Sequence, residues 1–119
     1  MAPVDLETRT TDFALRIIKL FAALPKTTEA QVLGKQLLRC GTSVGAHYRE
    51  AKRAKSTLDF VNKIEGALQE LDEACYWLQL LEKSEIIPAR RLSSLQTEAV
   101  ELTKILVTVV KRAKEKLKK

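Results

Sequence analysis

The chain has 119 residues, of which 45% are hydrophobic and 5% aromatic, and its formal net charge at pH 7 is +6. This length suits one domain, residues 1–119, with a sizeable core, and a composition rich in Leu, Ala, Lys and Glu favours helices over sheets. The sequence has no long apolar run, no signal-peptide pattern and only two cysteines, which argues against a membrane span, a disulfide framework or a zinc site, so we expect a cytoplasmic protein without metals or cofactors.

Apolar side chains recur every three or four residues in the first half of the chain, the spacing of one face of a helix. The first such run predicts a helix over residues 5–24, which ends before Pro25 because the residue before a proline disfavours the helical conformation. Thr28 followed by Gln31 has the pattern of a capping box, and it predicts a second helix over residues 28–54.

Two further helices are predicted in the second half. Ser56 suits the N-cap of a helix over residues 57–82, with Asp59 in its first turn, and Pro88 suits the first turn of a helix over residues 88–117. The apolar stripe of the third helix is Phe60, Ile64, Ala67, Leu71, Ala74, Leu78 and Leu81, and that of the fourth is Leu92, Leu95, Ala99, Leu102, Leu106, Val109 and Ala113. Four long helices with short connections predict an all-α, antiparallel, up-down-up-down four-helix bundle.

Two glycines in the second predicted helix require an explanation, because each costs about 1 kcal/mol relative to alanine in a helix interior. Gly41 and Gly45 lie four residues apart on one face, which indicates a close approach by another backbone or side chain. That contact could lie inside the subunit or between subunits. Since the second and third helices carry apolar residues on more than one face, we expect a homo-oligomer with Gly41, Gly45, Tyr48 and Trp77 in its interface.

Basic residues form two groups. Residues 30–58 hold six basic residues against Glu50 alone, and residues 111–119 hold six against Glu115 alone. Such groups bind phosphate backbones through charge, without reading base sequence. The candidate nucleic-acid-binding residues are Lys35, Arg39, Arg49, Lys52, Arg53, Lys55, Lys111, Arg112, Lys114, Lys116 and Lys118. The alternative is a solvated face, or pairing with residues 59–85, which hold seven acidic residues against two basic ones.

Features of a catalytic site are lacking in the sequence. His47 is the only histidine, and with Glu50 it forms one His-x-x-Glu pair rather than the two Glu-x-x-His motifs of a di-iron bundle. Tyr48 is the only aromatic residue near the first basic group, so stacking on single-stranded bases is not indicated. We therefore expect a non-enzymatic protein without a small-molecule substrate.

The second and third predicted helices also resemble a known family. The matching residues are GTSVGAHYREA (41–51), Ser56, Asp59, Phe60, Lys63, Glu70, Tyr76, Trp77 and Leu78. With these residues the chain resembles, over about residues 12–114, the bacterial four-helix-bundle proteins encoded in intervening sequences of 23S ribosomal RNA genes, also labelled S23 ribosomal protein. The resemblance implies a left-handed bundle assembled as a homopentameric ring, with no established enzymatic activity.

A similar fold occurs in the accessory protein of diversity-generating retroelements, which engages reverse transcriptase and nucleic acid. As a candidate function, the resemblance therefore implies binding of structured nucleic acid, or of a nucleic-acid enzyme, through the basic face. From this and the charge pattern, we expect a non-enzymatic oligomeric bundle that binds nucleic acid without sequence specificity. The alternative is an oligomeric scaffold for a protein partner, such as a nucleic-acid enzyme, whose charges pair subunits.

Overall fold

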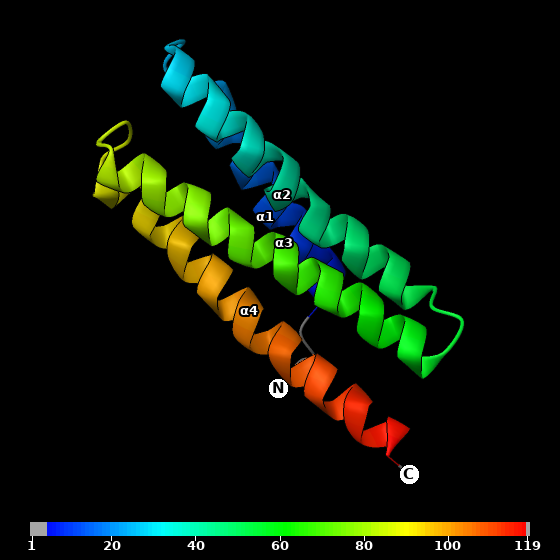
Figure 1. Ribbon diagram of the computed structural model, residues 1–119. Coiled ribbons are helices and arrows are strands. Elements are labelled where there is room, and N and C mark those ends of the chain that lie inside the picture. The colour runs from blue at the N-terminus through cyan, green and yellow to red at the C-terminus, as the bar shows by residue number, and fades with distance from the viewer. Residues whose placement is uncertain (1–4, 119) are drawn as a thin grey trace.

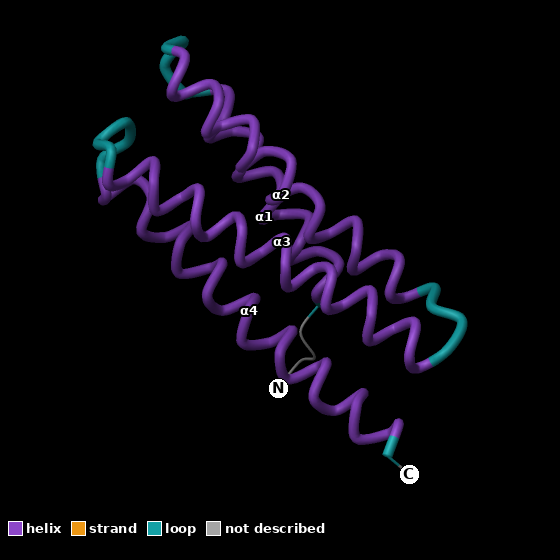
Figure 2. Tube along the Cα trace, in the orientation of Figure 1, coloured by secondary structure: helices purple, strands orange, loops and turns teal. Residues whose placement is uncertain are grey.

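The computed structural model describes residues 5–118, which form four antiparallel helices joined by short loops (Figure 1). The helices are α1 (Leu6–Ala22), α2 (Thr28–Lys52), α3 (Thr57–Lys83) and α4 (Ala89–Leu117). Figure 2 shows only helices and loops over the described residues, which confirms the predicted fold class. The predicted helix boundaries lie within two residues of the observed ones. No helix within residues 5–118 is both long enough and apolar enough to cross a membrane.

The helices begin where side chains satisfy their free N–H groups. The Asp5 carboxylate accepts a hydrogen bond from the Thr8 N–H at 3.1 Å, and the Ser56 hydroxyl accepts one from the Asp59 N–H at 3.0 Å, as predicted for Ser56. The predicted capping box at Thr28 is wrong by one residue. Thr27 is the N-cap of α2 and accepts from the Ala30 N–H, while the Gln31 side chain donates instead to the Pro25 carbonyl at 2.9 Å.

One apolar core runs through all four helices, and in α3 and α4 it follows the predicted stripes with two exceptions. Val110, rather than Val109, is buried in α4, and Phe60 at the start of the α3 stripe is only half-buried. The first difference arises because a strict heptad pattern drifts by about 20° per seven residues from a straight helix of 3.6 residues per turn. The second reflects the position of Phe60 at an open end of the bundle, described below.

The glycines of α2 face α1 inside the subunit. A Cβ atom added to Gly41 would lie 2.9 Å from Ile17 Cγ1, and one added to Gly45 would lie 3.3 Å from Thr10 Oγ1. Both glycines are buried by these contacts. The prediction that Gly41 and Gly45 form a subunit interface is therefore corrected, because α1 of the same chain occupies that face.

Of the adjacent helix pairs, α1 and α4 make the least contact, and an ion pair holds them together. The Arg9 guanidinium donates from Nε to Glu98 Oε2 at 2.9 Å and from Nη2 to Glu98 Oε1 at 2.8 Å. Further along, Arg16 Nη2 donates to Ser94 Oγ at 2.9 Å. These contacts place α1, which has 17 residues, beside the first half of α4, which has 29. The last turns of α4 therefore extend past the start of α1.

The Arg9–Glu98 pair makes the stability of the fold dependent on pH. Its hydrogen bonds lower the pKa of Glu98 below the usual value of 4.5, so its stabilisation is present at neutral pH and is lost as the pH falls below about 4.5 through the folded-state pKa. We expect Glu98→Gln to lower the free energy of unfolding by about 1 kcal/mol at pH 7, a modest value because both side chains are partly exposed. Urea unfolding at pH 7 and pH 3 should show this difference shrinking in acid. Glu115→Gln, at an exposed site, is the control.

Candidate nucleic-acid interface

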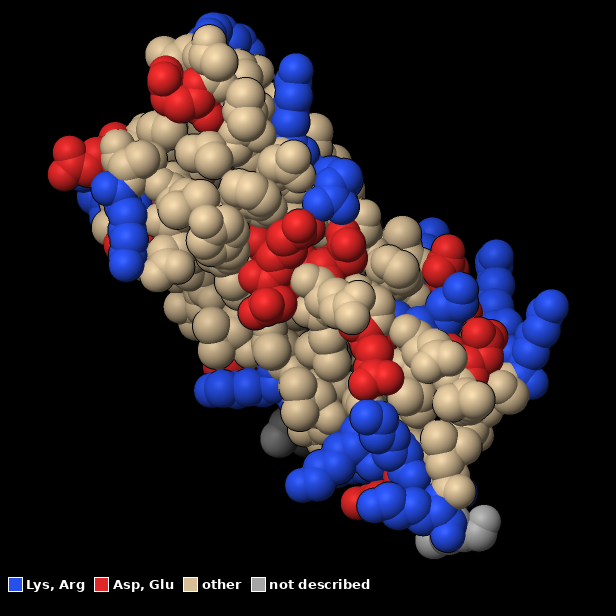
Figure 3. All heavy atoms as spheres, viewed as in Figure 1, with Lys and Arg blue, Asp and Glu red and all other residues tan. Residues whose placement is uncertain are grey.

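The two basic segments, far apart in the sequence, meet at one end of the bundle. This end comprises the last turn of α2, the loop to α3, the first turn of α3 and the last turns of α4. Basic side chains are favourable at helix C-termini, and in this antiparallel arrangement α2 and α4 both end here. Figure 3 shows blue side chains gathered toward this end and a red acidic group in the middle of the same face. We call this region the basic end.

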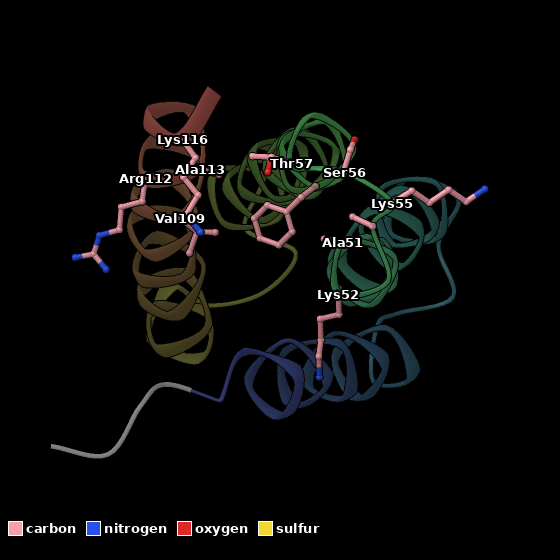
Figure 4. A pocket seen from close by; sticks show the side chains of 11 residues that line it. Ala51, Lys52, Lys55, Ser56, Thr57, Val109, Arg112, Ala113 and Lys116 are labelled. Carbon is pink, nitrogen blue, oxygen red and sulfur yellow. The ribbon is translucent and has the colours of Figure 1, made fainter. Parts of the chain in front are cut away.

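A groove of about 550 Å3 lies between the two basic segments (Figure 4). Its apolar lining is Ala51, Ala54, Phe60, Val109 and Ala113, and its basic lining is Lys52, Lys55, Arg112 and Lys116. Ser56 and Thr57 complete it, so no carboxylate lines the groove among the described residues. The groove exists because the described part of α1 lies beside Ser94 and Glu98 of α4 and leaves the later turns of α4 uncovered.

The basic side chains of the groove stand at its edges. Figure 4 shows Lys55 and Arg112 extending away from the opening on opposite sides, while Lys52 points toward α1. Lys52 Nζ lies 3.2 Å from Glu7 Oε1 on that helix. The basic rim of the groove thus draws Lys55 from the loop between α2 and α3 and Arg112 from α4.

Several predicted binding residues are already engaged in ion pairs within the subunit. Arg39 Nη2 lies 2.6 Å from Glu73 Oε2, and Arg39 Nη1 lies 3.5 Å from Glu70 Oε2. The hydrogen bond that Arg39 donates to the Glu73 carboxylate raises the pKa of Arg39 above its usual range. Lys114 Nζ lies 3.2 Å from Glu65 Oε2. Acidic residues of α3 therefore pair with basic residues of the same chain. For Arg39, this is the alternative to nucleic-acid binding that the charge pattern left open.

The remaining predicted residues are exposed and form no ion pair within residues 5–118. They are Lys35, Arg49, Arg53, Lys55, Lys111, Arg112, Lys116 and Lys118. Lys35 lies in the first half of α2, remote from the basic end, and all the others lie at that end. The structure thus separates Lys35 and Arg39 from the other basic residues of the 30–58 group and brings those others together with the 111–119 group.

A second hollow at the basic end includes a residue that the charge pattern did not assign to the site. Arg49, Arg53 and Lys55 line it together with Lys63 of α3 and two acidic residues, Glu50 and Asp59. Lys63 Nζ lies 3.6 Å from Glu50 Oε2, which partly neutralises the hollow. Lys63 was missed because it stands in the acidic segment 59–85, although its position in the second turn of α3 places it beside the end of α2.

Phe60 and Val109 were also not predicted as site residues from the sequence, because each belongs to an apolar stripe that predicts a buried core position. In the structure both are half-buried and line the groove. The only sequence signal was their position near helix ends, where fewer neighbours are available to cover a side chain.

Tyr48 and Trp77, the other two residues predicted for a subunit interface, are half-buried against the core of their own subunit. Trp77 Nε1 is buried and has no hydrogen-bond partner among the described residues. The bundle also exposes large apolar side chains on its surface: Leu15, Ile18, Val32, Leu58, Tyr76, Val100, Val107 and Leu117. These surfaces, rather than Gly41 and Gly45, are the ones open to another subunit.

His47 packs against Gly66 on α3, where an added Cβ atom would lie 3.0 Å from its Nδ1. Glu50 Oε2 lies 3.8 Å from the same nitrogen. Residues 5–118 contain no cluster of three or more His, Cys, Asp or Glu side chains suited to a metal ion. Burial raises the pKa of the Cys40 thiol to about 12, so this group is not a thiolate nucleophile at neutral pH.

The comparisons with known proteins agree with this fold. The family model of the 23S rRNA-intervening sequence protein matches residues 4–108. The chain is 39% identical in sequence to a protein of unknown function from the S23 ribosomal protein family of Bacteroides thetaiotaomicron, known from a crystal structure. The two structures superpose with a TM-score of 0.84 over 88% of this chain and 97% of that one. None of the curated proteins matches the sequence. The chain therefore belongs to the family of 23S rRNA-intervening sequence proteins, the family that its sequence resembles.

Proposed function

We propose that this protein is a non-enzymatic bundle that binds structured RNA or DNA through its basic end, without sequence specificity. One observation carries the proposal: the antiparallel order of the helices brings two distant basic segments to the same end of the molecule, around a groove that no carboxylate of the described residues lines. Arg49, Arg53, Lys55, Arg112 and Lys116 would contact phosphates, since each is exposed and has no ion-pair partner within residues 5–118.

The chemistry of these side chains supports binding by charge rather than by base sequence. They are long and exposed and lie in or next to helix ends, and no side-chain hydrogen bond within the described chain fixes them in the geometry that reading base edges requires. Binding would come from neutralising phosphates and releasing their counterions.

We also propose that the subunits assemble as a homo-oligomer, of five subunits as the family resemblance implies, and that the protein acts in the cytoplasm. Exposed Tyr76, Val100 and Val107 support contacts between subunits. Both cysteines are free thiols, as expected in a reducing compartment. Assembly would present several basic ends to one nucleic acid, and avidity would strengthen each weak contact.

The test is the affinity for a structured RNA and for a duplex DNA at several salt concentrations. If about four phosphates are neutralised, raising the salt from about 50 to about 200 mM should weaken binding by roughly 100-fold, with a linear log–log slope near −3.6. The solution mass, measured over the same range, should stay constant at a multiple of the 13.4 kDa chain. This result would show that salt acts on the ligand contact and not on the subunit contact.

Absence of binding at about 50 mM salt by an intact oligomer would contradict the proposal. The second candidate function, a scaffold for a protein partner, would then be favoured by the exposed apolar side chains of α3 and α4. An oligomer that dissociates at high salt would indicate that the charges pair subunits.

A further inference from the structure

The groove at the basic end has a feature that binding a double helix does not require. A duplex presents its phosphates on a convex surface, and exposed cations on helix ends suffice to contact them. The groove adds a recess of about 550 Å3, within the range of small-molecule sites, with an apolar floor and a cationic rim. This combination suits a group that joins a flat apolar ring to an anionic chain.

We propose, on the basis of the function proposed above, that the groove takes an unpaired nucleotide of the bound nucleic acid, with its base against Phe60 and its phosphates on the basic rim. The nucleotides of a duplex keep their bases stacked inside the helix, so only a bulged, looped or terminal nucleotide can enter. The protein would then prefer structured nucleic acids with unpaired positions over continuous duplexes.

Phe60 supplies the face for the base. The ring is half-buried, packs on the core along one side and lines the groove with the rest of its surface. The other apolar lining residues are small or branched aliphatic ones (Ala51, Ala54, Val109 and Ala113), which leave room beside the ring. Stacking on an aromatic side chain tolerates any base, in keeping with binding that does not depend on sequence.

The rim supplies the charge. Lys55, in the loop before α3, and Arg112 of α4 stand on opposite sides of the opening with their side chains extending outward, and Lys116 adds a third cation one turn beyond Arg112. None of these three forms an ion pair within the described chain. Charge complementarity thus favours a phosphate-bearing occupant over a neutral apolar one.

The test uses two RNA duplexes that differ only at one bulged position, which carries adenosine in the first and an abasic residue in the second. The number of phosphates and the flanking base pairs are the same, so the two duplexes differ only by the presence of the base. We expect the adenosine bulge to bind about tenfold tighter than the abasic bulge at about 100 mM salt, the size of one base–aromatic stack. A 4-thiouridine at the bulge should crosslink to residues 51–60 or 109–116.

Phe60→Leu and Phe60→Tyr form a matched pair, because both retain an apolar body at this half-buried position and only tyrosine retains the ring. In Phe60→Leu the affinities for the two bulged duplexes should differ by no more than about twofold, because only the affinity for the adenosine bulge falls. Phe60→Tyr should keep the preference. Circular dichroism and thermal unfolding would verify that both variants fold.

The outcomes separate this inference from the function on which it rests. Equal, salt-dependent affinity of the unmodified protein for both bulged duplexes would overturn the nucleotide site and leave nucleic-acid binding in place. No affinity for either duplex would overturn both. A lower solution mass of folded Phe60→Leu would show that a second copy of the chain fills the groove, and it would overturn the nucleotide site.

Discussion

Reversing the charges of Arg49 and Arg53 together should lower the affinity for structured RNA and for duplex DNA by about 100-fold at about 100 mM salt, because two phosphate contacts are lost and replaced by repulsion. Both side chains are exposed on the last turns of α2 and line two hollows of the basic end. Neither forms an ion pair within residues 5–118, so Arg49→Glu/Arg53→Glu should fold normally. Affinity at several salt concentrations and the solution mass are the measurements.

The matched control is Arg90→Glu/Arg91→Glu. These two arginines are neighbours in the sequence and exposed, and they lie in the first turn of α4 at the opposite end of the bundle (Figure 1). The control changes the net charge by the same amount, so any effect of overall charge appears equally in both variants. We expect the affinity of this control for RNA and DNA to stay within about threefold of the affinity of the unmodified protein. Equal losses in the two variants would contradict a localised interface and would indicate a response to net charge only.

Most of the fold could be predicted because its determinants are periodic and local. The three- and four-residue spacing of apolar side chains defines the buried face of each helix, and Pro25 and Ser56 mark boundaries through their own backbone chemistry. Short loops then leave an antiparallel bundle as the arrangement that buries all four stripes. The error at Thr28 also has a local cause. Thr27 and Thr28 both carry a hydroxyl that can cap a helix, and only the backbone geometry makes Thr27 the N-cap.

The candidate site could be predicted only in part, because it depends on how far each helix extends beside its neighbours. The sequence identifies Lys55 and Arg112 as members of basic groups, but not that they border one groove. Periodicity likewise cannot tell that Arg39 lies beside Glu73 of α3, or that Phe60 stands where α1 no longer covers the bundle. These facts follow from the axial alignment of the four helices, which the Arg9–Glu98 contact helps to set.

The glycines illustrate the same limit. Two glycines four residues apart predict a close approach on one face of α2, and that approach is present. Whether the approaching group belongs to the same chain or to another cannot be decided from spacing, since both arrangements require the same small residues. Only the position of Ile17 opposite Gly41 resolves the question in favour of packing within the subunit.

Gly41→Leu should therefore destabilise the subunit itself, lowering its free energy of unfolding by about 3 kcal/mol. The first added carbon would already lie 2.9 Å from Ile17 Cγ1 and 3.1 Å from Ile17 Cγ2, and Ile17 is fully buried and cannot move aside without displacing the core. The gain of about 1 kcal/mol from replacing a helical glycine is smaller than this strain. Urea unfolding followed by circular dichroism measures the loss. Ala46→Leu, an exposed site on the same helix, should change stability by less than about 0.5 kcal/mol.

Combining Gly41→Leu with Ile17→Ala tests whether the strain at residue 41 comes from contact with Ile17. Ile17→Ala alone should cost about 2 to 5 kcal/mol, because it leaves a cavity in the core. In Gly41→Leu/Ile17→Ala the new side chain can occupy the vacated space, so the combined loss should be smaller than the sum of the two single losses by at least about 1 kcal/mol. Such coupling is expected only if residues 17 and 41 touch within the subunit. If Gly41→Leu instead keeps its stability and lowers the solution mass, the close approach lies between subunits, and the packing of α2 against α1 described here is wrong.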